Sequence, residues 1–111
     1  MEKRPWGEFS IIARGDNFLI KKLIVFPGKR TSLQYHKHRE EYWIVLGGKG
    51  RIVKGDDTLN ISKGDFIKIS KGERHRIENT GGENLIILET WVGDVLDEND
   101  IVRLEDDYGR S

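Results

Sequence analysis

The feature that most constrains the fold is the arrangement of apolar residues in short runs, separated by breaks that contain glycine. The runs do not follow the 3.6-residue period of an amphipathic helix. Many short apolar runs with glycine turns between them are typical of a β-sandwich or barrel. We therefore predict an all-β fold, with a short helix possible only in Asp97–Asp106. The expected strands are Phe9–Ala13, Phe18–Phe26, Glu41–Leu46, Arg51–Lys54, Thr58–Ile61, Phe66–Ile69, Arg74–Glu78 and Asn84–Val92.

Length and composition limit what such a chain can do. The chain has 111 residues, which favours one domain over residues 1–111. It has no cysteine, so any metal must be held by nitrogen and oxygen ligands. The formal net charge is zero, which argues against a nucleic-acid partner. Neither a secretory signal nor an apolar stretch long enough to span a membrane occurs, so we expect a cytoplasmic protein without a membrane partner.

The placement of the three histidines suggests a metal site. Gln34, His36 and His38 alternate along the chain, and alternate side chains of a regular strand share one face. Glu41 follows shortly after, and His75 lies in a later block. Imidazole, carboxylate and amide groups together suit Zn, Mn, Fe, Co or Ni and leave positions open for water or substrate.

The two blocks that carry these residues resemble the paired motifs of the cupin superfamily. The first motif runs from Pro27-Gly28 through His36 and Glu41 to Gly48. The resemblance implies a cupin double-stranded β-helix (jelly-roll) barrel with a divalent metal inside it, zinc first and Mn, Co, Ni or Fe as alternatives. The second motif comprises Gly64, Ser70, Gly72, His75 and Asn79, with Ser70 in place of the usual proline.

The frame of the first motif decides which residues take the ligand positions. The spacing from Glu41 to Gly48 places His36 in the second histidine position and Gln34 in the first. A competing frame would use His36 and His38, but it leaves only two residues before Glu41. We prefer the first frame, which gives Gln34, His36, Glu41 and His75 as the metal ligands.

A closer resemblance covers nearly the whole chain. The chain is similar to the type II mannose-6-phosphate isomerase domain found at the C-terminus of bifunctional mannose-1-phosphate guanylyltransferase/mannose-6-phosphate isomerases. That family places glutamine in the first ligand position. The sequence has no nucleotidyltransferase domain before the barrel, so guanylyltransferase activity is expected to be absent. The similar segments are Arg4-Pro5-Trp6-Gly7, Pro27-Gly28, Ser32–Arg39, Glu41–Val45 and Ile101–Arg110.

The resemblance implies a metal-dependent aldose–ketose isomerase that interconverts mannose 6-phosphate and fructose 6-phosphate through an enediol(ate). His38 and Glu41 are the candidates for the base, although a carboxylate that binds the metal directly would be a poor one. Arg39 completes the catalytic set. The substrate-binding candidates are Arg39, Arg110, Lys37, Arg74 and Tyr108, with Arg76 and Lys29 as further cations for the phosphate.

Three features have less specific interpretations. We expect Trp6, Trp43 and Trp91 to be core or dimer-interface residues. The tail acids Glu105, Asp106 and Asp107 form either a catalytic cluster or a cap held by salt bridges. The Arg4–Gly7 segment either crosses to a neighbouring barrel or covers an edge strand, and a homodimer is expected.

Two other functions remain open at the level of the sequence. The chain could be a metal-binding cupin that binds a sugar or effector without isomerase activity. It could also be another metal-dependent cupin enzyme, such as a dioxygenase. The fold cannot separate these alternatives, because function depends on the site and not on the architecture.

Overall fold

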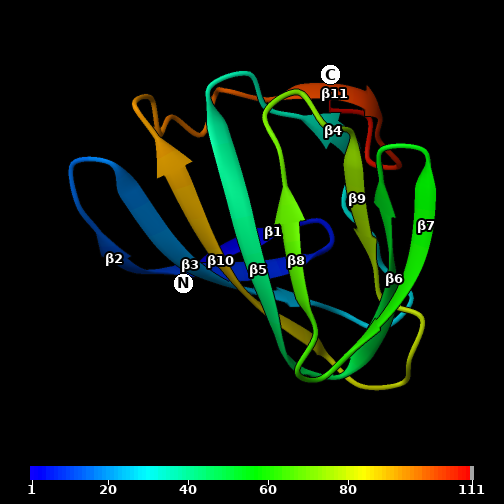
Figure 1. Cartoon of the computed structure of the whole chain (residues 1–111). Helices are drawn as coiled ribbons and strands as arrows, with labels where there is room; N and C mark the ends of the chain where they lie inside the picture. The colour runs from blue at the N-terminus through cyan, green and yellow to red at the C-terminus, as the bar shows by residue number, and fades with distance from the viewer. Residues whose placement is uncertain (111) are drawn as a thin grey trace.

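The computed structural model describes residues 1–110, and this part of the chain forms eleven β-strands and no helix. The strands build two facing antiparallel sheets, with the order β1-β2-β3-β10-β5-β8 in one and β11-β4-β9-β6-β7 in the other (Figure 1). The strands are β1 (Glu2–Arg4), β2 (Gly7–Arg14), β3 (Phe18–Val25), β4 (Leu33–Tyr35), β5 (Arg39–Gly47), β6 (Lys49–Lys54), β7 (Asp57–Ser62), β8 (Phe66–Ile69), β9 (His75–Glu78), β10 (Leu85–Gly93) and β11 (Val102–Glu105).

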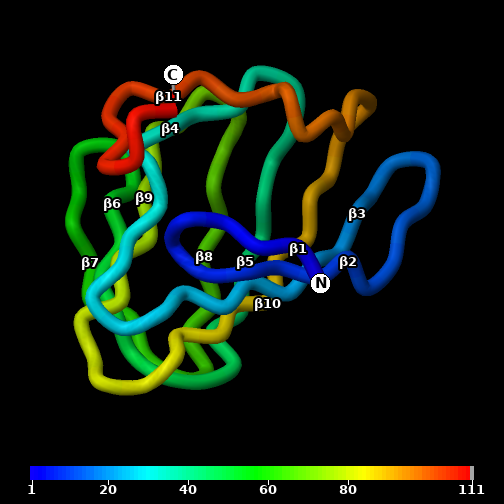
Figure 2. The backbone as a smooth tube through the Cα atoms, turned by 180° about the vertical axis from the view of Figure 1, so that it is seen from behind, coloured from blue at the N-terminus to red at the C-terminus, as the bar shows by residue number. Residues whose placement is uncertain are grey.

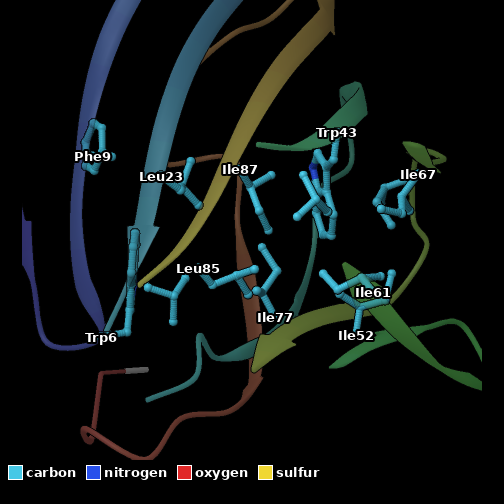
Figure 3. Packing of buried hydrophobic residues seen from close by; sticks show 13 residues of the cluster. Trp6, Phe9, Leu23, Trp43, Ile52, Ile61, Ile67, Ile77, Leu85 and Ile87 are labelled. Carbon is cyan, nitrogen blue, oxygen red and sulfur yellow. The ribbon is translucent and has the colours of Figure 1, made fainter. Parts of the chain in front are cut away.

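The core lies between the sheets, because alternate residues of each strand point inward. On β10 the residues Leu85, Ile87, Glu89 and Trp91 are buried, while the residues that alternate with them are more exposed. Ile52 and Ile77 face Leu85 and Ile87 from the second sheet (Figure 3). Apolar side chains thus fill one end of the space between the sheets and leave the other end for polar groups.

Two residues of the predicted motifs have structural roles at the closed end. The backbone of Gly48 has φ +79°, and a Cβ there would lie 2.5 Å from the carbonyl oxygen of Asn84, so only glycine fits. The buried Asn79 donates to the carbonyls of Val25 and Glu83 at 2.8 and 2.7 Å and accepts from the N–H of Gly81 at 2.9 Å. Asn79 therefore ties the ends of three segments together.

The prediction of an all-β fold is confirmed, and a strand forms at each of the eight expected runs. The short helix considered possible in Asp97–Asp106 does not form. Residues 94–101 form a loop across the open end, and β11 pairs with β4 instead. In both views the C-terminal segment, drawn in red, lies at the same end of the barrel as β4 (Figures 1 and 2).

The N-terminal segment covers an edge, as one of its two interpretations expected. β1 pairs with β2 at the edge of the six-stranded sheet, and the turn between them carries Trp6 into the core. Trp43 and Trp91 are also buried in this chain, so all three tryptophans are core residues. The described residues hold no helix with the length and apolarity that a bilayer-spanning helix needs.

Candidate metal centre and its cavity

The structure brings three of the four expected ligands into one buried cluster. His36 follows the end of β4, Glu41 lies on β5 and His75 begins β9. Their ligand atoms lie within 4.8 Å of one another. The Nε2 atom of His36 is 3.2 Å from Nε2 of His75 and 3.1 Å from Oε2 of Glu41. All three side chains are at most 3% exposed.

The hydrogen bonds of the two imidazoles fix which nitrogen of each ring carries the proton. Nδ1 of His36 donates to the carbonyl of Asp100 at 2.6 Å, and Nδ1 of His75 donates to the carbonyl of Glu73 at 3.0 Å. Since a carbonyl only accepts, each neutral ring turns an Nε2 lone pair toward the other. Two such lone pairs beside a carboxylate form a donor set for a bound cation, and the Nη2 of Arg39 lies 3.2 Å from the Nε2 of His36 at the edge of this set. Backbone partners of this kind are also the usual means of orienting metal-bound histidines.

The protonation states of the cluster suit a cation. Burial lowers the pKa of His36 to about 4 and also lowers the pKa of His75, so both rings are neutral at pH 7. Burial alone would raise the pKa of Glu41, but the neighbouring His75, Arg39 and His36 lower it below its usual value. Two neutral imidazoles and a carboxylate fit a divalent metal.

Gln34 lies beside this cluster on β4. Its Nε2 is 3.4 Å from Nε2 of His75, and its Oε1 accepts a hydrogen bond from the Ser32 hydroxyl at 2.6 Å. As placed, the amide turns its N–H toward His75. A ligand role needs the amide oxygen there instead. A half-turn of the amide provides this, because the serine hydroxyl can accept as well as donate.

Arg39 supports the cluster from β5. Its Nε donates to Oε2 of Glu41 at 2.8 Å, and its Nη2 lies 3.2 Å from Nε2 of His36. The guanidinium also stacks over the Trp91 ring at 3.3 Å and donates to the carbonyl of Asp97 at 3.3 Å. Arg39 therefore lines the cavity, and its side chain is already engaged in orienting Glu41.

The cluster opens into a cavity of about 220 Å³ between the sheets. This is below the roughly 300–1,000 Å³ of sites for drug-sized ligands, so it suits a small metabolite. Trp6, Phe9, Leu23 and Ile77 form apolar walls. The polar lining comprises Arg4, Lys21, Thr31, Gln34, His36, Arg39, Glu41, His75, Glu89, Glu98, Asn99, Arg103 and Arg110.

Three of the lining arginines, Arg4, Arg103 and Arg110, come from the two ends of the chain. We call them the arginine cluster. Arg103 pairs in register with Gln34, which pairs with His75 on the next strand. Since neighbouring strands lie about 4.7–4.9 Å apart, the backbones of Arg103 and His75 are about 10 Å apart.

Arg103 is the unusual member of the arginine cluster. Among residues 1–110, its Nε is the buried side-chain polar atom without a hydrogen-bond partner. Burial and the neighbouring Arg110 lower its pKa. A cationic donor left unpaired beside like charges favours an anion in this part of the cavity.

Four of the expected site residues lie outside the cavity. The expectation that His38 shares a face with Gln34 and His36 is wrong, because β4 ends at Tyr35. The Asp100 carboxylate accepts from the N–H groups of Lys37 and His38 at 2.9 Å each, which holds this segment in a bend and leaves both side chains exposed. His38 therefore does not reach the cavity as a base, nor Lys37 as a phosphate ligand.

Arg74 and Tyr108 are likewise occupied elsewhere. Arg74 is exposed and pairs with Asp56 at 2.6 Å, because the inward position beside it belongs to His75. The Tyr108 hydroxyl donates to the carbonyl of Arg30 at 3.0 Å, and its ring packs on the core. Neither lines the cavity, so the structure does not support them as substrate ligands.

The remaining cations and the tail acids are paired with one another. Buried Arg76 contacts Glu105 at 3.2 Å, Arg30 contacts Asp107 at 2.6 Å, and Arg110 contacts Asp106 at 2.9 Å. Lys29 is exposed and outside the cavity. Of the two interpretations of the tail acids, the salt-bridged cap is the correct one.

Several polar cavity residues were not anticipated as site residues: Arg4, Lys21, Thr31, Glu89, Glu98, Asn99 and Arg103. Glu89 had a detectable signal, since alternation along Leu85–Trp91 puts it on the inward face among apolar residues. Burial, together with the negative charge of Glu41, raises the pKa of Glu89 to about 8. It is the strongest buried acid/base candidate that the sequence pattern left unassigned.

Comparison with known proteins agrees with this architecture. Residues 2–106 match the family described as the mannose-6-phosphate isomerase C-terminal domain. The xanthan biosynthesis protein XanB of Xanthomonas campestris pv. campestris is 42% identical over 108 residues, which is 97% of this chain and 23% of that protein. The mannose-1-phosphate guanylyltransferase RfbM of Salmonella typhimurium is 40% identical over 108 residues, 97% of this chain and 22% of that protein. The chain thus spans less than a quarter of these relatives.

A solved structure shows the same architecture. A conserved protein with a double-stranded β-helix domain from Klebsiella pneumoniae superposes with a TM-score of 0.80. The match covers 96% of this chain and 90% of that one, at 17% identity. Identity this low concerns the fold alone, and it confirms the prediction of a cupin-type double-stranded β-helix.

Proposed function

The chain belongs to the mannose-6-phosphate isomerase C-terminal family, and from this premise we propose that it is a metal-dependent isomerase of mannose 6-phosphate and fructose 6-phosphate. The proposal depends on one observation. A single small cavity holds both a cluster suited to a divalent metal and an arginine cluster with an unpaired cation. A sugar phosphate has a carbonyl group that suits the metal cluster and a phosphate group that suits the arginine cluster.

The spacing of the two clusters favours a short phosphorylated sugar. Gln34 and His75 lie in one row of the five-stranded sheet with Arg103, at backbone distances of about 5 and 10 Å from it. In a hexose 6-phosphate the phosphate lies at the opposite end of the carbon chain from C1 and C2. Arginine suits the phosphate end because its planar fork matches two phosphate oxygens. The sugar carbons would then lie against Arg39, Glu89 and the apolar walls.

The proposed reaction moves a proton between C1 and C2. His36, Glu41 and His75, with Gln34 beside them, would hold the metal, and Arg39 keeps the Glu41 carboxylate in place. A bound divalent cation supplies Lewis-acid polarisation of the sugar carbonyl. The loop of residues 94–101 covers one side of the cavity. It is held there because its backbone carbonyls accept hydrogen bonds from His36 and Arg39 and its Glu98 side chain pairs with Lys21.

Zinc is the first metal to test, and the expected homodimer and cytoplasmic location stay predictions.

The proposal is tested by a coupled assay for fructose 6-phosphate. The protein is stripped with chelator and reloaded with Zn, Mn, Co, Ni or Fe(II), with Gln34→Ala as the site variant. We expect turnover only with metal, reduced turnover for Gln34→Ala, and at least about 100-fold lower kcat/KM for unphosphorylated mannose. Absence of turnover with every metal, combined with binding of mannose 6-phosphate, would instead favour a sugar-phosphate-binding module.

A further inference from the structure

Two adjacent strands of the cavity wall carry the same three-residue pattern. β5 contains Glu41-Tyr42-Trp43 and β10 contains Glu89-Thr90-Trp91. In each, the tryptophan indole N–H donates to the glutamate two residues earlier, at 2.9 Å on β5 and 3.1 Å on β10. Since the strands are antiparallel, Glu41 pairs with Trp91 and Trp43 pairs with Glu89.

All four side chains point inward and are at most 5% exposed. The two glutamates are diagonal neighbours on one face of the sheet, a relation that places Cα atoms about 7–8 Å apart. The β5–β10 pair therefore presents two carboxyl groups to one cavity.

The surroundings of these carboxyl groups differ. Glu41 receives Arg39 at 2.8 Å and Trp43 at 2.9 Å and lies in the metal cluster. Within the described chain, the Glu89 side chain accepts one hydrogen bond, from Trp91. Its register neighbour Lys21 instead binds Glu98 at 3.1 Å. One oxygen of Glu89 is thus left without a hydrogen-bond partner in the cavity lining.

The other acid or base groups of the cavity are committed. His36 and His75 use Nδ1 for backbone carbonyls and turn Nε2 into the metal cluster. Lys21 binds Glu98 and lies over the Phe9 and Trp91 rings at 4.1 and 4.0 Å.

We propose that Glu89 is the group that carries the proton between C1 and C2 of the bound sugar phosphate, an inference that rests on the proposed isomerase function. The Glu89 carboxylate takes the proton from C2 of the open-chain aldose. The C–H electron pair forms the C1–C2 double bond, and the carbonyl pair moves onto O1. A proton passes from O2 to O1, Glu89 returns its proton to C1, and the C2 carbonyl of the ketose forms.

The electrostatic surroundings suit a group that must both take and return a proton. Burial and Glu41 raise the pKa of Glu89 to about 8, against the opposing effects of Lys21, Trp91 and Arg39. These groups come from β3, β5 and β10, the three strands that meet at this part of the wall. Burial, the largest of these effects, favours the neutral acid, and one oxygen of Glu89 is without a partner in the cavity lining, so the group is placed both to take and to return a proton.

Glu89→Gln tests the role, because the amide oxygen can still accept from Trp91. The matched control is Glu83→Gln, whose side chain is exposed and outside the cavity. For metal-loaded wild type and both variants, kcat, KM, metal content and the Kd for mannose 6-phosphate are measured. Loss of the C2 hydrogen in D₂O is followed by NMR.

We expect Glu89→Gln to lower kcat and C2 exchange by about 100-fold or more, while metal content and Kd stay within about threefold. An active wild type with an unimpaired Glu89→Gln would overturn the Glu89 role alone. A loss of metal or substrate binding that accounts for the lost rate would also overturn it. An inactive wild type would remove the isomerase function and the Glu89 role with it.

Discussion

Replacing Arg103 by methionine should make the protein more stable and weaken its binding of phosphorylated ligands. The Nε of Arg103 is buried without a partner, and Arg110 and Arg4 are like charges near it. An unpaired buried donor costs about 1–3 kcal/mol, and methionine keeps much of the apolar stem without that donor. The free energy of unfolding should therefore rise by about 1–3 kcal/mol. For a domain of this size, each kcal/mol raises Tm by about 4–8 °C.

The same substitution removes a charge-assisted hydrogen bond to the ligand. Such bonds contribute about 1.5–3 kcal/mol, and a factor of ten corresponds to about 1.4 kcal/mol. The Kd for mannose 6-phosphate should therefore rise by about 10- to 100-fold, while binding of the metal is unchanged.

The assay combines urea and thermal unfolding of the metal-free protein with calorimetric titration of mannose 6-phosphate. Arg14→Met is the matched control, since Arg14 is exposed and outside the cavity. A loss of stability in Arg103→Met, with ligand binding equal to that of the control, would refute the assignment of Arg103 to an anion site.

Two further predictions concern the scaffold. Asn79→Ala should lower the free energy of unfolding by about 2–4 kcal/mol, because it removes the three hydrogen bonds of a buried side chain, and urea unfolding measures this. The hydrogen bonds from Arg110 lower the pKa of Asp106, so its contribution is present above the ordinary value of 3.8 and is lost as the pH falls through the lower folded-state pKa. Asp106→Asn should therefore show a smaller loss of stability on acidification than the wild type, and equal acid sensitivity of the two would contradict this.

The fold was largely predictable because its strands carry their own signals. The run Asn84–Val92 alternates inward and outward residues, and glycines separate the other runs. The strands missing from the expected runs, β1, β4 and β11, have no more than four residues each and depend on partners for their conformation, and only the β4 region was considered as a strand, through the alternation of Gln34 and His36. No helix forms in Asp97–Asp106, because its second half pairs with β4 as β11. The local sequence could not show this pairing, since the paired residues are some 70 positions apart in the chain.

The site was predictable where motif spacing fixed it. His36, Glu41 and His75 meet as the cupin resemblance implies, and the structure places Gln34 next to them. His38 was misplaced because alternation was extended beyond the end of β4, where Asp100 bends the chain.

The arginine cluster could not be predicted from local sequence. Arg4 and Arg103 come from opposite ends of the chain and meet only through the packing of β1 and β11 around the cavity. The inward position of Glu89 was visible in the sequence, but its proximity to Glu41 required the register between β10 and β5.

Calorimetric titration of a divalent metal into chelator-stripped protein tests the central claim most directly. The wild type and His38→Ala, whose side chain lies outside the cavity, should each bind one ion per chain, while His75→Ala should bind it at least about 100-fold more weakly. Equal affinity in the wild type and His75→Ala, or a loss of binding in His38→Ala alone, would contradict a metal centre built on His36, Glu41 and His75.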